Sequence, residues 1–366
     1  MRVLHVFKTY LPDSFTGVER VIWEIAEGAA GFGIRSHVFY LSEKSSASPI
    51  RIGGHWAHTA KRNFEIASTP FSLGGLARFK ALAGRADIIH YHFPWPQMDV
   101  FHLLSNMKTL SVVTYHSDVV RQKKLFHFYR PIMHRFLNSV DRIVATSPNY
   151  VASSEILQKY SNKINIIPIG LDPSKLPGAT PERMAFWKEK LPPRFFLFLG
   201  APRYYKGLPF LMDAAKRSGL PVVFAGAGVF DTTRCETLTF LGKVSDEDKA
   251  ALLELCEAFV FPSHLRSESF GVALLEAAFA GKAMISCEIG TGTSYVNAHG
   301  VTGLVVPPAD SAGLAEAMTA LWANPQQTRA YGEAARERAH QLFSARHMVE
   351  SYRDVYRDLV RNRIST

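Results

Sequence analysis

The chain has 366 residues, enough for two domains that each bury a core of their own. Hydrophobic residues make up 47% and charged residues 20%, a composition that excludes a disordered chain. The three cysteines form no CxxC pair, so we expect neither a disulfide framework nor a structural zinc site, and a reducing cytoplasm fits. The N-terminal apolar run is too short for a signal peptide, and no uncharged run reaches the ~18 residues of a membrane span.

The net charge of +10 is unevenly distributed. Residues 1–180 hold 21 Lys and Arg against 12 Asp and Glu, whereas residues 181–366 hold 21 against 20. A basic N-terminal half indicates an anionic partner, which the charge alone leaves open as a phosphorylated substrate, an acidic membrane surface or nucleic acid.

Short apolar runs alternate with amphipathic ones along the whole chain. In the first half we expect strands at 2–7, 36–41, 87–91, 111–115, 142–146 and 164–167, with helices at 18–30 and 148–159. From residue 195 the runs FFLFLG, PVVFAG, LTFLG, AFVFP, AMISC and GLVVP repeat the pattern, with helices at 206–218, 246–256, 271–281 and 309–322. This alternation predicts an α/β protein with two Rossmann-like, doubly wound domains.

The domain boundary is indicated by proline, because residues 168–194 hold six of the twenty prolines. We expect an N-terminal domain over 1–172, a linker over 173–194 and a C-terminal domain over 195–344. The remaining polar stretch, 324–362, reads as helical and contains no strand.

The strongest chemical signal is the segment Glu268-Ser-Phe-Gly-Val-Ala-Leu-Leu-Glu276, which follows the apolar run 258–262. Gly271 is expected to open a helix, with Glu268 before it and Glu276 about two turns into it. The unpaired N–H groups around Ser269 to Val272 would suit a phosphate or diphosphate, and the flanking carboxylates would accept hydrogen bonds from sugar hydroxyls. The alternative is that Glu268 caps the helix and Glu276 is a surface charge.

This segment resembles the E-x-F-G-x-x-x-x-E signature of the retaining glycosyltransferases of family GT4, which have the GT-B fold. Five further pieces occur in the family's order, so that the resemblance covers essentially the whole chain. They are Gly17-Val-Glu-Arg20, Thr114-Tyr-His116-Ser-Asp118, Ile167-Pro-Ile-Gly-Leu-Asp172, Leu199-Gly-Ala-Pro-Arg203-Tyr-Tyr-Lys206-Gly207 and Gly303-Leu-Val-Val-Pro-Pro308.

The resemblance implies an inter-domain cleft, an N-terminal domain that binds the acceptor and a C-terminal domain that binds a nucleotide sugar. It also implies that a C-terminal helix over about 345–366 crosses back to the first domain. Catalytic roles fall to His116, facing the donor sugar, and Glu268, whereas Gly17 would approach the diphosphate. The donor site would be Arg203, Lys206, Ser269, Phe270, Gly271, Val272 and Glu276.

Under the resemblance, two fixed cations and a helix N-terminus neutralise the leaving diphosphate, and no metal or other cofactor is required. Lys206 matches the family's position for a cation, whereas Arg203 is displaced from the usual position of the other cation. The alternative for both is a surface charge on a loop, and for His116 it is an ordinary core or loop histidine. The literal D-x-D at Asp246 to Asp248 is read as a capping box with Ser245, not as a metal site.

The basic surplus has a local source in residues 121–142, where Lys123, Lys124 and Arg130 are interleaved with aromatic and aliphatic side chains. Residues 71–85 have a similar composition. Such a stretch is typical of an element that meets an anionic membrane surface, and equally of a helix that packs on a sheet with a solvated basic rim. The two interpretations are compatible.

The segments around 116–130 and 143–154 look most like mannosyl- and rhamnosyltransferases of bacterial lipopolysaccharide and O-polysaccharide assembly. This implies a GDP-linked donor, a lipid-linked saccharide acceptor and a cytoplasmic enzyme attached peripherally to the inner face of the membrane, with no nucleic acid partner. One alternative is a transferase of the same fold that uses UDP-N-acetylhexosamine, UDP-glucose or UDP-galactose. Another is a non-catalytic basic protein that binds membrane or nucleic acid, which would leave Glu268 and Lys206 without a role.

Overall fold

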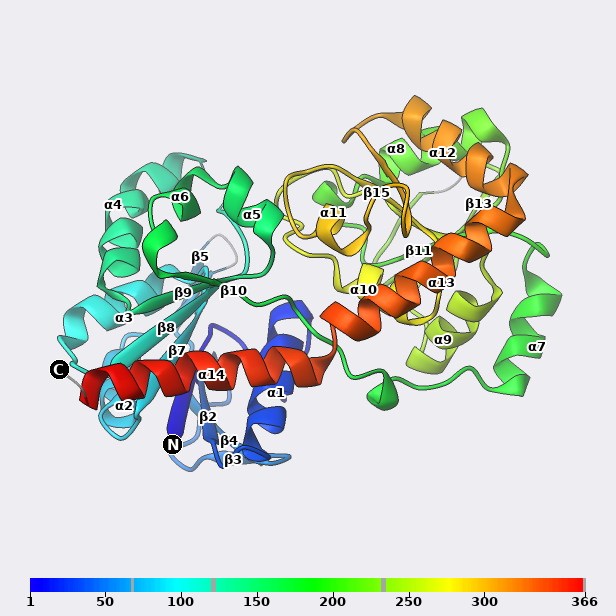
Figure 1. The fold of residues 1–366 in the computed structure, drawn as a ribbon. Coiled ribbons are helices and arrows are strands. Elements are labelled where there is room, and N and C mark those ends of the chain that lie inside the picture. The colour runs from blue at the N-terminus through cyan, green and yellow to red at the C-terminus, as the bar shows by residue number, and fades with distance from the viewer. Residues whose placement is uncertain (67–68, 120–122, 232–234, 365–366) are drawn as a thin grey trace. The chain divides into compact units, whose positions relative to one another are not determined.

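The computed structural model describes residues 1–66, 69–119, 123–231 and 235–364, and of residues 123–125 and 364 it describes the backbone alone. The chain forms two compact units. Unit 1 is Met1–Gly170 together with Ala345–Thr366, and unit 2 is Leu171–Ser344. Each unit is a parallel sheet covered by helices, as predicted from the alternation of the sequence (Figure 1).

Unit 1 contains an eight-stranded sheet in the order β10-β9-β8-β7-β1-β2-β4-β3, in which β3 alone is antiparallel to its neighbour. A separate two-stranded ribbon pairs β5 with β6. The strands are β1 (Arg2–Val6), β2 (Arg35–Ser42), β3 (Ile50–Ile52), β4 (His55–Lys61), β5 (Phe64–Ile66), β6 (Thr69–Phe71), β7 (Ile88–Phe93), β8 (Leu110–Tyr115), β9 (Arg142–Ala145) and β10 (Ile164–Ile166).

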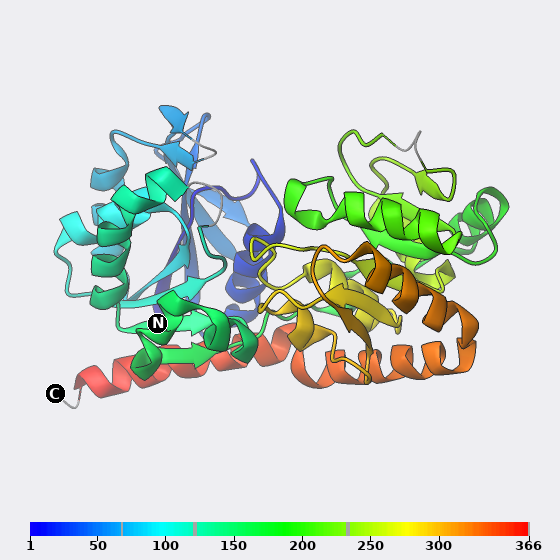
Figure 2. The same ribbon diagram turned by 90° about the horizontal axis from the view of Figure 1, so that it is seen from above.

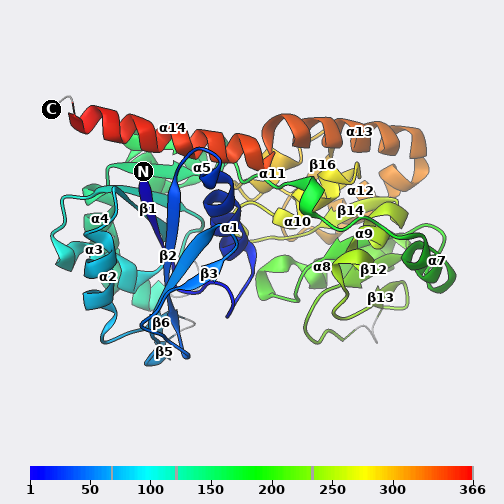
Figure 3. The same ribbon diagram turned by 90° about the horizontal axis from the view of Figure 1, so that it is seen from below.

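The helices of unit 1 cover both faces of this sheet (Figures 1 and 3). They are α1 (Gly17–Ala30), α2 (Gly75–Ala83), α3 (Pro96–Ser105), α4 (Lys123–Ser139), α5 (Pro148–Ser153), α6 (Glu155–Gln158), the short 3-10 turn η1 (Ser161–Lys163) and α14 (Ala345–Ile364). The predicted return of the C-terminal helix is confirmed, because α14 runs along unit 1 and packs against α1 (Figure 2).

Alternation along the strands assigns each residue of the unit 1 sheet to one face. Leu4, Ile89 and Tyr91 belong to a core cluster with residues of α2, α3 and α4. Their neighbours His5 and His90 therefore point to the opposite face, where α1 and α14 lie, and His90 does contact a tyrosine of α14 there.

Unit 2 contains a six-stranded, wholly parallel sheet in the order β13-β12-β11-β14-β15-β16, which is the 3-2-1-4-5-6 order of a doubly wound domain. The strands are β11 (Phe196–Leu199), β12 (Val222–Ala225), β13 (Leu238–Phe240), β14 (Ala258–Phe261), β15 (Met284–Cys287) and β16 (Gly303–Val306). The helices are η2 (Pro173–Lys175), α7 (Pro181–Lys190), η3 (Tyr204–Lys206), α8 (Leu208–Ser218), α9 (Asp246–Leu255), α10 (Val272–Phe279), α11 (Thr293–Val296), α12 (Ser311–Ala323) and α13 (Pro325–Leu342).

The predicted linker over 173–194 is corrected by the structure, since these residues belong to unit 2 and contain η2 and α7. Pro173 and Pro181 stand in the first turns of these helices, where proline costs no hydrogen bond. Helix α7 is capped by Thr180 and packs against α9. Among the described residues, no helix is both long and apolar enough to cross a membrane.

Candidate active site

The sheet of unit 2 reverses its strand order between β11 and β14, and ligands of open α/β sheets bind at the carboxyl ends of strands at such a point. The loop after β11 carries Arg203 and Lys206, and the loop after β14 carries Glu268. The fold therefore brings together, at one edge of one sheet, residues that are more than sixty positions apart in sequence.

The two loops approach each other so closely that glycine is required at position 207. Gly207 has a φ of +70°, and a Cβ built there would lie 1.9 Å from the carbonyl oxygen of Pro262. The backbone N–H of His264 donates to the carbonyl oxygen of Tyr205 at 3.0 Å. The position of Lys206 relative to the second loop is thus fixed by backbone contacts.

Lys206 and Glu268 form an ion pair between Nζ and Oε2, and their side chains are only 14% and 12% exposed. The Lys206 ammonium also lies 4.5 Å from the ring centre of Phe261, and Ser263 Oγ donates to Glu268 Oε2 at 3.4 Å. Arg203, in contrast, is exposed. The sequence singled out both charges of the pair but did not predict that they meet.

The backbone that carries Glu268 leads directly into α10 and is held from the neighbouring loop. Thr291 Oγ1 donates to the carbonyl oxygen of Glu268 at 2.8 Å, and Gly292 N donates to that of Ser269 at 2.8 Å. Gly271 caps α10 with a φ of +85°, as a left-handed residue before a helix requires. The side chain of Phe270 is buried, so only its backbone is suited to meet a ligand.

The start of α10 has the properties of an anion site. The N–H of Leu274 donates to Gly271 O at 2.8 Å, so the N–H groups of Gly271 and Val272 precede the first intrahelical bond. These groups carry partial positive charge next to the Lys206–Glu268 pair. Glu276 lies one turn into α10, rather than the two turns expected, and is half-buried.

In unit 1, His116 directly follows β8 and is 3% exposed. Its N–H donates to Phe93 O at 3.0 Å, and its Nε2 lies 2.9 Å from Nδ1 of His92. Burial lowers the pKa of His116 to about 3, so the ring is neutral at pH 7. Asp118 accepts a hydrogen bond from Tyr115 at 2.8 Å, which keeps the segment after His116 close to β8.

The sequence reading missed His92 and His5, which lie behind His116. The available signal was the presence of histidine at alternate positions of strands that are otherwise apolar, in RVLHV and IIHYHF. A polar residue at such a position faces a helix layer and needs a partner.

Gly17 is the first residue of α1, and a Cβ built on it would meet no described protein atom within 4 Å. The loop before it is organised by Glu19, whose carboxylate accepts hydrogen bonds from Thr9, Ser14 and Thr16 at 2.7, 2.9 and 2.6 Å. Glu19 is 3% exposed and therefore acts inside the loop.

Helix α4 packs one face into the core of unit 1 through Met133 and Phe136, whereas Phe128 is 80% exposed and Arg130 is exposed. The prediction that this helix packs one face on the sheet is confirmed. Phe128 and Arg130, on its exposed face, are accessible to a partner. The side chains of Lys123 and Lys124 lie outside the described residues.

The D-x-D segment is the capping box predicted from the sequence, because Ser245 Oγ accepts from Asp248 N and the Asp248 carboxylate accepts from Ser245. Asp248 is also bound by Trp187 and Arg183 of α7. Burial by itself would raise the pKa of the Asp248 carboxyl. The hydrogen bonds from Trp187, Arg183 and Ser245 outweigh burial and hold this pKa below its usual value. The carboxylate is fully engaged in joining α7 to α9.

A switch-point site of this kind, with a cation beside a helix N-terminus, is suited to bind the phosphate groups of a sugar phosphate or a nucleotide. Residues 15–175 match the description Glycosyltransferase Family 4, and residues 180–338 match Glycosyl transferases group 1. The chain is 50% identical over 353 residues to D-rhamnosyltransferase WbpZ of Pseudomonas aeruginosa, covering 94% of this chain and 93% of that protein. It is 48% identical to O-antigen chain mannosyltransferase C of Escherichia coli, covering 99% and 100%.

Among solved structures, sucrose-phosphate synthase from Thermosynechococcus elongatus is similar with a TM-score of 0.80 at 19% identity, over 99% of both chains. Anabaena Alr3699/HepE in complex with UDP and glucose is similar with a TM-score of 0.77 at 16% identity, over 98% of this chain and all of that one. These likenesses show the GT-B fold. The chain belongs to glycosyltransferase family 4, and it is a retaining hexosyltransferase of a family that acts without a metal ion.

Proposed function

We propose that this enzyme transfers a mannose- or rhamnose-type hexose from a GDP-linked donor to a lipid-linked saccharide during assembly of a cell-surface polysaccharide. The observation that carries the proposal is the identity of about one half to a D-rhamnosyltransferase and to an O-antigen chain mannosyltransferase, over nearly the whole length of each.

The diphosphate of the donor is assigned to Lys206 and to the N–H groups at the start of α10. The support is their proximity, because the ion pair with Glu268 holds the ammonium beside that helix start. When a diphosphate binds, Lys206 exchanges part of its contact with Glu268 for the phosphate oxygens, and the Glu268 carboxylate becomes available to the transferred sugar. Glu276 is assigned to the nucleotide ribose, and the exposed Arg203 to a secondary role.

His116 is assigned to a hydroxyl of the transferred sugar, with Gly17 beside the diphosphate. The support for His116 is its place at the carboxyl end of β8 and its neutral ring, which can donate one hydrogen bond. The support for Gly17 is the open space next to its Cα.

A donor screen tests the reaction. Purified enzyme is incubated with GDP-mannose, GDP-D-rhamnose, UDP-glucose or UDP-N-acetylglucosamine and an acceptor, and released nucleotide diphosphate is measured. We expect release of GDP from one or both GDP-sugars and only background release from UDP-sugars. Turnover of a UDP-sugar alone would overturn the proposal and support the alternative donor class.

We also propose that the enzyme attaches peripherally to the anionic inner face of the cytoplasmic membrane through unit 1. Support comes from the charge surplus of residues 1–180 and from the exposed Phe128 and Arg130 of α4. A lipid-linked acceptor would be met at this surface.

A further inference from the structure

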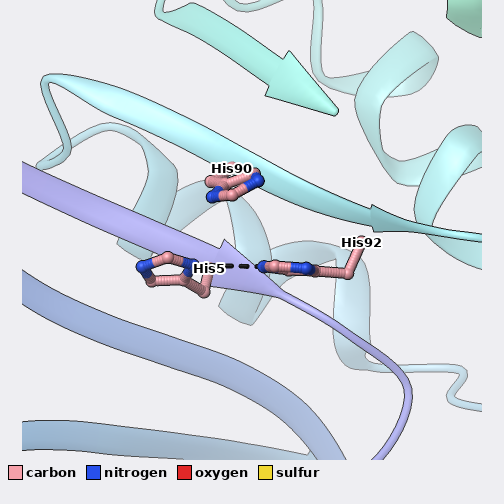
Figure 4. Close-up of side chains that lie close together, drawn as sticks. All are labelled: His5, His90 and His92. Atoms are coloured by element: carbon pink, nitrogen blue, oxygen red, sulfur yellow. Dashed lines mark hydrogen bonds between the residues drawn. The ribbon is translucent and has the colours of Figure 1, made fainter. Parts of the chain in front are cut away.

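Three histidine rings form a continuous chain of hydrogen bonds inside unit 1. His5 Nδ1 lies 3.1 Å from His92 Nε2, and His92 Nδ1 lies 2.9 Å from His116 Nε2. Figure 4 shows the first of these contacts, between β1 and β7, with the ring of His90 next to it. His5 and His92 are 0% exposed, so the chain runs from the centre of the sheet to His116, the residue that follows β8.

All three rings are neutral. Burial lowers the pKa of His5 and of His116 to about 3 and lowers that of His92 well below its usual value. A neutral imidazole carries one N–H and one bare nitrogen, so each ring that bonds at both nitrogens donates once and accepts once. The chain therefore has a direction, and only two arrangements of its hydrogens are consistent with both bonds.

The far end of the chain selects between the two arrangements. His5 Nε2 is buried and has no hydrogen-bond partner among the described residues. If His116 donated towards His92, this nitrogen would carry a buried N–H without an acceptor, which proteins rarely tolerate. If His5 donates, Nε2 is merely a bare nitrogen. The second arrangement leaves His116 accepting at Nε2 and carrying its hydrogen on Nδ1.

The ring of His90 packs against two rings of the chain. Its centre lies 4.3 Å from that of His92 and 5.0 Å from that of His5. It is itself held by Tyr356 of α14 at Nδ1 and by Thr114 at Nε2, both at 2.7 Å.

The cluster of His5, His90 and His92 also has the spacing of a metal site, with ligand nitrogens within 4.8 Å of one another. Five of its six ring nitrogens, however, already bond to protein groups. These bonds account for the cluster without an ion.

We propose that His92, supported by His5, is a positioning residue that fixes His116 as a hydrogen-bond donor through Nδ1 towards the sugar donor. The inference rests on the proposed role of His116, and it adds the reason why that ring can only donate to its ligand. The substrate group it selects is an acceptor of hydrogen bonds, such as a hydroxyl oxygen of the transferred hexose.

The direction of the chain is tested without any assay of activity. In protein labelled with ¹⁵N-histidine, ring nitrogen shifts report which nitrogen of each neutral imidazole carries hydrogen, and the His116 signals are identified by their loss in His116→Gln. We expect His116 to carry its hydrogen on Nδ1 in the unliganded wild type. Hydrogen on Nε2 would overturn the proposal, whatever the enzyme transfers.

Two substitutions of His92 test its effect on the reaction. The amide of His92→Asn lies near the position of Nδ1 and can still donate to His116, whereas the amide of His92→Gln lies near Nε2 and cannot. We expect His92→Gln to lower kcat about tenfold with little change in the KM for the nucleotide sugar, and His92→Asn to retain kcat within about threefold.

The matched control is His58→Asn. His58 is a buried histidine of β4 that bonds to His37 at 2.9 Å, and among the described residues no hydrogen bond joins it to the chain that ends at His116. We expect this variant to lose thermal stability like the His92 variants while keeping kcat within about twofold. If both His92 variants lower kcat equally, or only in proportion to their lost stability, His92 is structural and the proposal fails. If His116→Gln itself is fully active, the proposed role of His116 fails, while the direction of the chain is still decided by the ¹⁵N shifts.

Discussion

The two units have the same architecture but place their polar groups differently. In unit 2 the strands β11 and β14 are apolar and buried throughout, and the charged groups Lys206 and Glu268 stand in the loops that follow them. In unit 1 the strands themselves carry buried histidines, and the proposed contact to the sugar, His116, is the end of that network that follows β8.

Because of this difference, we expect substitutions at the unit 2 site to affect mainly activity, whereas substitutions of the unit 1 histidines should affect activity and stability together. A charged side chain in a loop of unit 2 lies outside the hydrophobic core, so its removal should reduce catalysis more than it destabilises the fold. A histidine in the unit 1 sheet is part of the core, and its removal leaves buried partners unsatisfied. Acid, charge neutralisation and single substitutions can each test this contrast.

As the pH is lowered, unit 1 should unfold at a higher pH than unit 2. The buried histidines His5, His90, His92 and His116 resist protonation in the fold, whereas in the unfolded chain they take up protons below pH about 6.5. The free energy of unfolding is therefore greatest above pH 6.5 and falls as the pH drops towards 3. Each such histidine removes about 1.4 kcal/mol per pH unit in this window.

Hydrogen exchange measured by mass spectrometry between pH 7.5 and 5 separates the units. Peptides from β7 should lose protection at higher pH than peptides from β14. Unit 2 has His264, His299 and His340, none of which is buried. Simultaneous loss of protection in both units would contradict the comparison.

Neutralising Lys123, Lys124 and Arg130 together should weaken binding to anionic vesicles about a hundredfold, since each basic residue near an acidic surface contributes about 1 kcal/mol. Co-sedimentation with liposomes measures this, and high salt should have the same effect on the wild type. Activity on a short water-soluble acceptor should be nearly unchanged, whereas a lipid-linked acceptor should be used poorly.

A triple variant of Lys188, Lys190 and Lys216, which are exposed in unit 2, is the matched control of equal charge change. It should bind vesicles like the wild type. Equal losses in the two triple variants would show that net charge, not unit 1, governs the binding.

Lys206→Ala should reduce kcat/KM by about 10- to 100-fold, the worth of a charge-assisted contact to the leaving diphosphate. Arg203→Ala, with an exposed side chain, should cost less than threefold. Thermal unfolding of Arg203→Ala should stay close to the wild type, whereas Lys206→Ala should lose some stability because it leaves the largely buried Glu268 carboxylate without its partner. The reverse order of activities would assign the primary role to Arg203.

Removal of the Glu268 carboxylate and removal of the Glu276 carboxylate should have smaller effects that differ in kind. Glu268→Ala should lower turnover about tenfold while GDP still binds, and Glu276→Ala should raise the Kd for GDP about tenfold, each losing contacts to sugar hydroxyls. Steady-state kinetics and GDP titration of the same two proteins distinguish these outcomes. Wild-type behaviour of both would place the donor site elsewhere.

Chelation is expected to have no effect. Activity in excess EDTA should equal that of the untreated enzyme, because Lys206 and the start of α10 supply the positive charge and Asp248 is occupied by α7. A loss that only Mn²⁺ or Mg²⁺ restores would contradict the metal-independent site.

The sequence predicted the parts of the fold whose strands are continuous apolar runs, such as β1, β11 and β14. It missed β3, β5 and β6, because these strands have three residues each and are defined by their pairing partners, and it missed β4 because HWAHTAK mixes polar with apolar residues. Proline also misled the reading of 173–194, since Pro181 begins a capped helix instead of a connection.

Local sequence motifs predicted the site residues Lys206, Glu268 and His116. Their contacts were not predicted, because the Lys206–Glu268 pair depends on β11 and β14 being neighbours and the chain behind His116 depends on β1, β7 and β8 lying side by side. Adjacency of parallel strands is a property of the whole sheet and leaves no local trace in the sequence.

Calorimetric titration of the wild type and of Lys206→Ala with GDP and with UDP tests whether unit 2 binds a GDP-linked donor at Lys206. If unit 2 binds a GDP-linked donor at Lys206, GDP should bind the wild type at least tenfold more tightly than UDP, and Lys206→Ala should weaken GDP binding by about tenfold or more. Tighter binding of UDP, or GDP binding that is unchanged in Lys206→Ala, would contradict the account.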